Sequence, residues 1–163
     1  MRLDPKQIAV EYYFGDLQYW KLPQIAANAL EEGYDGPALR NLAGMANRRR
    51  SDLRADDVSE IEIDSVFREM GIDAPITRDK AQLILAIQSA ERALNGASNA
   101  FDEATYVRIH LCRLSDPPEV LSSIANLSEE AMNAPRSQWN RIEGALQNAF
   151  AALLKCHGIQ NPE

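Results

Sequence analysis

The sequence has no hydrophobic run long enough to cross a bilayer. Its longest apolar runs, Leu83–Ile87 and Ala149–Leu154, are far shorter than the roughly 20 residues of a membrane-spanning helix. The first residues lack the apolar core of a signal peptide, and two cysteines, Cys112 and Cys156, are too few for the disulfide framework of a small secreted domain. We therefore expect a protein of the cytoplasm that does not associate with membranes.

Motifs of the common enzyme classes are also missing. There is no Gly-x-Ser-x-Gly elbow, no phosphate-binding glycine-rich loop and no His-Glu-x-x-His motif. Four potential metal ligands occur as two pairs, His110 with Cys112 and Cys156 with His157. On a helix, residues i and i+2 point about 200° apart and adjacent residues about 100° apart, so neither pair converges on one ion. We predict no catalytic residue, no metal and no cofactor.

What the sequence does contain is the composition of an ordinary globular domain. Its 163 residues are 45% apolar and 25% charged, and a chain of this length usually forms one domain. The net charge of −7 is unevenly spread: residues 1–55 carry eight Lys/Arg and seven Asp/Glu, whereas residues 56–163 carry nine and seventeen. An acidic chain repels a phosphate backbone, which argues against nucleic acid as a partner.

Helix caps and helical periodicity recur along the whole chain. Helices are expected between Asp4 and Gly15, Leu22 and Gly33, Gly36 and Gly44, Val58 and Gly71, Thr77 and Gly96, Asp102 and Leu114, Pro117 and Leu127, and Pro135 and Gly158. The last of these carries Trp139 on its apolar stripe, and Asp102 is the expected cap of its helix. The sequence predicts an all-α fold, an irregular array of seven or eight helices built from helical hairpins. We expect one domain over residues 1–163; a subdivision near residues 72–77 is the alternative.

One segment, residues 22–44, has a distinctive pattern. A helix ends in Gly33-Tyr34-Asp35, and Leu39-Arg40-Asn41-Leu42-Ala43-Gly44 follows. This segment resembles a stretch in a family of small uncharacterised bacterial proteins. The resemblance implies a bacterial source and an all-helical fold, but it does not imply any activity.

Aromatic residues are concentrated near the N-terminus. Five of the eleven lie within nine positions, namely Tyr12, Tyr13, Phe14, Tyr19 and Trp20. Tyr and Trp are enriched at binding hot spots because they bury much area while keeping a polar tip. The other interpretation, which the sequence slightly favours, is that these residues fill the core where two helices join.

The basic residues Arg48, Arg49, Arg50 and Arg54 form the one basic cluster, directly before a run of acidic residues that extends from Asp56 to Asp64. We prefer neutralisation of one cluster by the other within the molecule; an acidic protein partner and RNA are the alternatives. The acidic run itself is typical of a solvated face, although paired carboxylates can also perform acid–base catalysis.

These patterns together favour a non-enzymatic helical protein that binds a protein partner or associates with itself. The candidate partner-binding residues are Tyr13, Phe14, Tyr19, Trp20, Arg48, Arg49 and Arg50. Two other functions remain open: a small enzyme with an acidic groove, and a structural subunit of a homo-oligomer.

Overall fold

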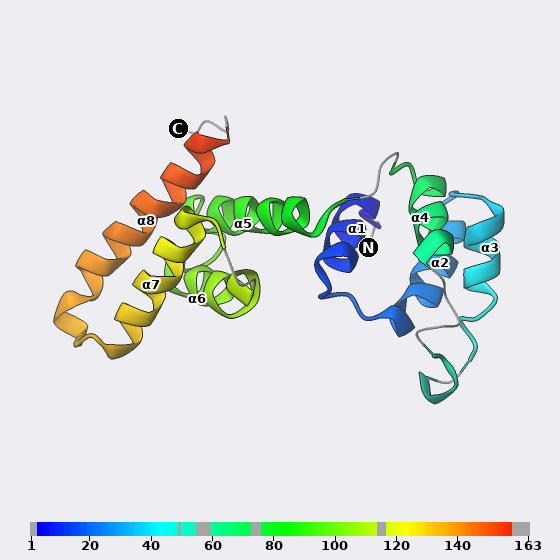
Figure 1. The fold of residues 1–163 in the computed structure, drawn as a ribbon, viewed down its shortest axis with the longest axis horizontal. Helices are drawn as coiled ribbons and strands as arrows, with labels where there is room; N and C mark the ends of the chain where they lie inside the picture. The colour runs from blue at the N-terminus through cyan, green and yellow to red at the C-terminus, as the bar shows by residue number, and fades with distance from the viewer. Residues whose placement is uncertain (1–2, 49, 55–59, 73–75, 114–116, 158–163) are drawn as a thin grey trace. The chain divides into compact units, whose positions relative to one another are not determined.

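The computed structural model describes residues 3–48, 50–54, 60–72, 76–113 and 117–157. Within these ranges the chain forms eight α-helices and no strand, so the predicted all-α fold of seven or eight helices is confirmed (Figure 1). The helices are α1 (Pro5–Phe14), α2 (Leu22–Glu31), α3 (Pro37–Ala43), α4 (Glu60–Glu69), α5 (Arg78–Leu94), α6 (Ala100–His110), α7 (Glu119–Asn133) and α8 (Trp139–Cys156). Short 3₁₀ turns are η1 (Tyr19–Lys21), η2 (Arg50–Asp52), η4 (Leu111–Arg113) and η5 (Arg136–Gln138). No helix among these residues is long and apolar enough to cross a membrane.

The chain divides into two compact units, Met1–Ala81 and Gln82–Glu163. The first contains α1 to α4 and the start of α5; the second contains the rest of α5 and α6 to α8. The expectation of a single domain stays a prediction.

In unit 1, α3 packs against both α2 and α4, and the core is apolar. The Asp4 side chain accepts a hydrogen bond from the Gln7 N–H at 3.1 Å and so caps α1, as the sequence predicts. At the other end, Gly15 adopts a left-handed conformation with φ of 98° and donates its N–H to the last carbonyls of the helix. Buried core residues include Ala9, Val10, Leu22, Ala26, Ala29, Leu39, Leu42, Ile63, Val66, Phe67 and Met70.

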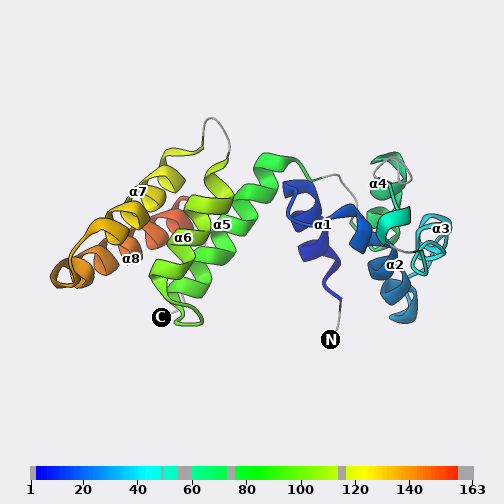
Figure 2. The ribbon, with the colours of Figure 1, turned by 90° about the horizontal axis from the view of Figure 1, so that it is seen from below.

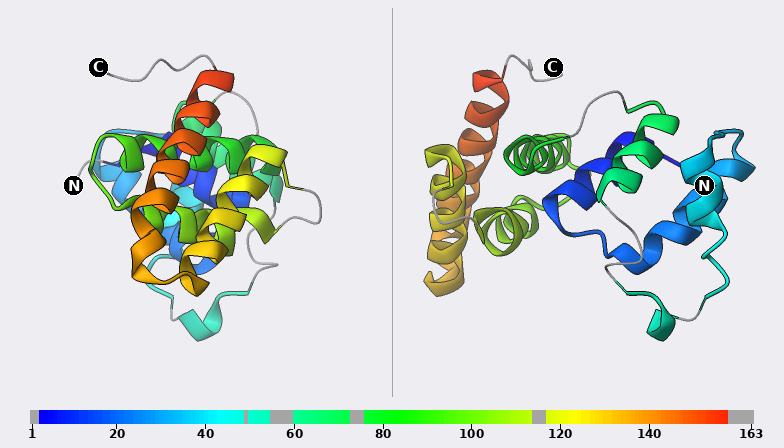
Figure 3. Two further views of the ribbon diagram at one scale, coloured as in Figure 1. Left: turned by 90° about the vertical axis from the view of Figure 1, so that its left-hand side faces the viewer. Right: turned by 45° about the vertical axis from the view of Figure 1, so that its right-hand side comes forward.

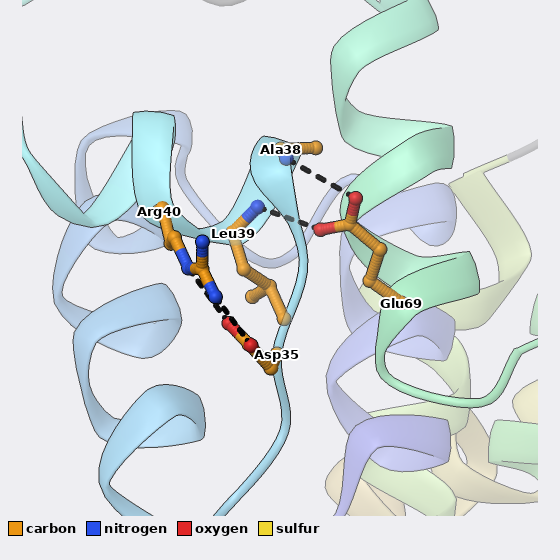
Figure 4. A network of polar contacts seen from close by, with 5 residues as sticks. All are labelled: Asp35, Ala38, Leu39, Arg40 and Glu69. Carbon is orange, nitrogen blue, oxygen red and sulfur yellow. Dashed lines mark hydrogen bonds and ion pairs between the residues drawn. The ribbon is translucent and has the colours of Figure 1, made fainter.

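A carboxylate of α4 caps the N-terminus of α3. The Glu69 oxygens accept hydrogen bonds from the N–H groups of Ala38 and Leu39, at 3.1 and 2.8 Å (Figure 4). Because the first N–H groups of a helix have no intrahelical acceptor, this contact satisfies two of them. Beside it, Arg40 binds the Asp35 carboxylate with two donors, and both side chains are exposed.

Unit 2 is built on a helical hairpin, α7 and α8, which lie side by side and antiparallel (Figures 2 and 3). Helix α6 contacts both of them. Apolar residues at helical spacing face inward, among them Leu85, Ala104, Val107, Leu121, Ile124, Ile142, Leu146, Phe150 and Leu153.

Two details of unit 2 differ from the sequence prediction. Asn99, not Asp102, caps α6, because its side chain accepts the Phe101 N–H at 2.8 Å. Trp139, expected on the buried stripe, is 43% exposed because it is the first residue of α8; its ring centroid lies 5.8 Å from that of Phe101.

The one buried carboxylate in the described core belongs to Glu103, which is 6% exposed. It accepts two hydrogen bonds from the Arg92 guanidinium at 2.8 Å and one from the Ser89 hydroxyl at 2.5 Å. Burial raises its pKa, but the bonds from Arg92, Ser89 and Ser98 outweigh burial, so the pKa of Glu103 lies below its ordinary value. The ion pair thus holds α5 and α6 together.

Candidate partner-binding surface

The turn after α1 brings together aromatic residues of α1 and of η1. The N–H groups of Gly15, Asp16 and Leu17 all donate to the carbonyl of Glu11, which folds the backbone back over the end of the helix. The chain then enters η1, whose Tyr19 and Trp20 precede α2. This local geometry places residues from the end of α1 and from η1 around one hollow.

That hollow, here called the aromatic pocket, has a volume of about 740 Å³. Its walls include Tyr12, Tyr13, Tyr19 and Trp20, together with the carboxylate of Asp64 from α4. A volume of this size falls in the range of sites that bind small ligands.

Two residues of α4, Asp64 and Phe67, contact the tyrosines of the pocket. The buried ring of Phe67 packs against Tyr12 and Tyr13, with centroids 5.7 and 5.5 Å apart, while the two tyrosine rings meet edge to face at 5.3 Å. The Tyr13 hydroxyl donates a hydrogen bond to the Asp64 carboxylate. Burial and the bond and charge of Asp64 raise the pKa of Tyr13, so its phenol stays protonated in neutral solution.

The η1 side of the pocket is fixed by one long-range contact. The Tyr19 hydroxyl donates to the backbone carbonyl of Leu53 at 3.2 Å. Trp20 is half-buried, and the Lys21 ammonium lies 5.4 Å from the centre of its ring. Both aromatic side chains therefore keep part of their surface open to solvent.

The candidate residues from the sequence fall into three groups. Tyr13, Tyr19 and Trp20 line the aromatic pocket. Phe14 does not: it is 3% exposed, because as the last residue of α1 it points into the core, and the Arg78 guanidinium lies 5.9 Å from its ring centre.

The arginines are placed less completely. Arg48 is exposed, and Arg50 begins η2, although the structure describes only its backbone. Arg49 lies outside the described residues, as do residues 55–59, on which neutralisation of the basic cluster by the acidic run would depend. That neutralisation stays a prediction.

Sequence reasoning missed the role of two residues. Tyr12 belongs to the aromatic cluster but is not among the candidate partner-binding residues, and Asp64 stands in the sequence only as part of the acidic run. Asp64 lies 51 positions from the tyrosine that binds it, and nothing local in the sequence signals the pairing. Its position on a helix with Phe67, three residues on, is the one hint that it faces the aromatic cluster.

The histidines and cysteines lie elsewhere. His110 stacks on Tyr106 with ring centroids 5.0 Å apart, and the Cys112 thiol donates to the carbonyl of Leu121 at 3.5 Å. Burial raises the pKa of Cys112. Cys156 and His157 are exposed at the end of α8. In the part of the chain that the structure describes, no three His, Cys, Asp or Glu side chains are placed to hold a metal ion.

The arrangement in unit 1 is suited to binding. Aromatic faces offer a large, stiff contact area, and the Asp64 carboxylate adds a fixed negative charge at their edge. These residues of the chain itself are the basis for inferring function, since no protein-family model, curated protein or solved structure matches it.

Proposed function

We propose that this protein acts by binding another protein, and that the aromatic pocket of unit 1 is where the partner docks. The observation that supports this most directly is the convergence of Tyr12, Tyr13, Tyr19 and Trp20 on one pocket. Tyrosine and tryptophan bury a large area while losing little rotamer freedom, which is why they dominate interface hot spots. An apolar or cationic side chain of the partner would be the inserted group.

The chemistry of the pocket favours binding over catalysis. Its carboxylate, Asp64, is bound by the Tyr13 hydroxyl, and the raised pKa of that tyrosine keeps the proton on the phenol. The bond holds Asp64 in one orientation through Oδ1 and leaves Oδ2 as an acceptor for a cationic group of a partner. The Tyr13–Asp64 pair is better suited to fixing the shape and charge of the wall.

The proposed setting is the bacterial cytoplasm. Both cysteines are free thiols, Cys112 half-buried and Cys156 exposed, as reducing conditions would keep them. The net charge of −7 favours a partner that is not a nucleic acid. A bacterial source rests on the resemblance of residues 22–44 alone.

The test compares two tryptophans. Trp20→Ala removes the largest side chain of the pocket, whereas Trp139→Ala removes one that is 43% exposed in unit 2. After a partner is identified by co-purification and mass spectrometry, its affinity for the purified wild type and both variants is measured by calorimetry. Trp20→Ala should weaken binding by about 2 kcal/mol, roughly 30-fold, and Trp139→Ala should not.

Thermal melts accompany the affinities. Because Trp20 is half-buried, Trp20→Ala should reduce the free energy of unfolding by less than the roughly 3–5 kcal/mol lost when a fully buried tryptophan is truncated. Equal affinities of wild type and Trp20→Ala for the partner would show that the aromatic pocket is not part of the interface. If co-purification retains no other partner, and sedimentation shows that wild type self-associates whereas Trp20→Ala does not, the protein is instead a homo-oligomer.

A further inference from the structure

A second groove adjoins the aromatic pocket and differs from it in chemistry. It lies between α1 and α2, within unit 1, and has a volume of about 750 Å³. Half-buried aliphatic side chains line it, namely Leu3, Ile8, Leu17 and Ile25. Four carboxylates line it as well: Asp4, Glu11, Glu31 and Glu32. The combination is an apolar surface with a negative border, here called the acidic groove.

Three of the four carboxylates of the acidic groove accept a hydrogen bond from a neutral group. Glu32 accepts the N–H of Leu3 and Glu11 accepts the Gln7 amide, both at 2.8 Å, and Asp4 caps α1. Among the described residues none of the four is in an ion pair, and no lysine or arginine lines the groove. A neutral donor leaves the charge of a carboxylate in place, so the groove keeps its negative potential.

One residue belongs to both surfaces. Leu17 lines the acidic groove and the aromatic pocket alike, so a single extended segment can contact both. The aromatic pocket adds one further carboxylate, that of Asp64. Carboxylates therefore border the apolar surface of the groove and the aromatic surface of the pocket, where the Lys21 ammonium lies beside Trp20.

From this complementarity we infer that the acidic groove binds a basic, amphipathic segment of the protein partner, an inference that rests on the proposed function. Aliphatic side chains of the segment lie against Leu17 and Ile25, and its lysines or arginines face the carboxylates. A second copy of this chain fits less well, because its net charge of −7 adds like charges. An anionic lipid surface is repelled for the same reason.

The groove can be tested without the natural partner. The probe is a fluorescein-labelled synthetic peptide of about 15 residues, with leucine at helical spacing i, i+3, i+4 and i+7 and lysine elsewhere. One control peptide replaces each lysine with glutamate, and a second replaces each leucine with serine. Fluorescence anisotropy of the full-length protein should show tightest binding of the Lys/Leu peptide. Raising the salt from about 0.05 to about 0.5 M should weaken it.

The matched variants are Glu31→Lys and Glu129→Lys. Glu31 is exposed on the groove and has no hydrogen bond with a described residue, so its reversal should leave the fold intact. Glu129 is equally exposed on α7, and its reversal changes the net charge by the same amount. Glu31→Lys should weaken peptide binding at least about tenfold, and Glu129→Lys by less than about twofold.

Three outcomes would contradict the inference. Equal loss in both variants would mean that only the overall charge matters, and no binding up to about 1 mM would mean that the groove takes no such segment. Self-association abolished by Glu31→Lys would make the occupant a second copy. The Trp20→Ala variant separates the two proposals. If it still binds the peptide but no longer binds the partner, both proposals are supported. If it no longer binds the partner and the peptide does not bind at all, only the proposal for the aromatic pocket is supported.

Discussion

A methyl group on Gly36 would lie 2.0 Å from the carboxyl carbon of Glu69. Gly36 is extended, with φ of 169°, a conformation that any residue can adopt. Glycine is needed here because a side chain would occupy the space of Glu69. The vacant volume is what lets the Glu69 carboxylate reach the N–H groups of Ala38 and Leu39 (Figure 4). A glycine before a helix thus admits a cap that comes from another helix.

Gly36→Ala should therefore destabilise unit 1. The flexible Glu69 side chain can rotate away from the new methyl group, but α3 then loses two hydrogen bonds, at a cost of about 1–2 kcal/mol. Chemical unfolding followed by circular dichroism measures the change. In a Glu69→Ala background the same substitution should cost much less, because the cap is already gone.

Gly144→Ala is the control for this experiment. Gly144 lies inside α8, and a Cβ atom there would meet nothing within 4 Å. Alanine should stabilise the helix by about 0.5–1 kcal/mol. Similar effects of Gly36→Ala and Gly144→Ala would contradict the role assigned to the space beside Glu69.

The Glu103–Arg92 pair predicts how unit 2 responds to acid. Because the pKa of Glu103 is lower in the folded protein, its stabilising contribution is present above the unfolded-state pKa of about 4.3 and is lost as pH falls through the folded value. Glu103→Gln should reduce the free energy of unfolding at pH 7 by about 1–3 kcal/mol, since Arg92 loses its charged acceptor.

Urea unfolding at a series of pH values between about 3 and 7 provides the measurement. The loss of stability on acidification should be smaller in Glu103→Gln than in wild type. Glu129→Gln, on an exposed site of α7, should keep the wild-type dependence. Parallel curves for wild type and Glu103→Gln would show that the buried carboxylate does not control this response.

The Tyr13–Asp64 bond predicts a response to alkali. A raised phenol pKa means that the contribution of Tyr13 to stability is intact below the ordinary tyrosine value of about 10 and is lost only as pH rises through the folded value. Ultraviolet titration of the phenolates in wild type should show one group that ionises later than an ordinary tyrosine. Tyr13→Phe should remove that group and cost about 1 kcal/mol of stability.

Asp64→Asn refines the assignment. It removes a negative charge beside the phenol but leaves burial, which is the largest cause of the shift. The late-titrating group should therefore move towards lower pH without becoming ordinary. If neither substitution alters the late phase, it belongs to another tyrosine.

The sequence predicts the helices well because caps and periodicity are local. Asp4, Gly15 and Gly96 act within a few residues of themselves, and each marks a helix boundary where expected. Competing caps are harder to rank, as with Asn99 and Asp102, because either side chain can reach a free N–H. Exposure at helix ends is harder still, since it depends on how far the neighbouring helix extends.

The candidate site was predictable only in its local part. Tyr13, Tyr19 and Trp20 are close in sequence, and a turn between two helices had to bring them together. Asp64 joins them through a contact across 51 positions, and Glu69 reaches α3 across about 30. Such pairs require the packing of α4 to be known, and a single sequence does not contain it.

The Glu69 cap has a consequence for the order of folding. Helix α3 has seven residues, too few to persist alone in water, where isolated helices shorter than about 12 residues are marginal. Its first N–H groups find their acceptor only after α4 has formed and docked. Helix α3 should therefore appear late on the folding pathway, and its amides should exchange with solvent whenever α4 detaches, so the two helices open as one cooperative segment.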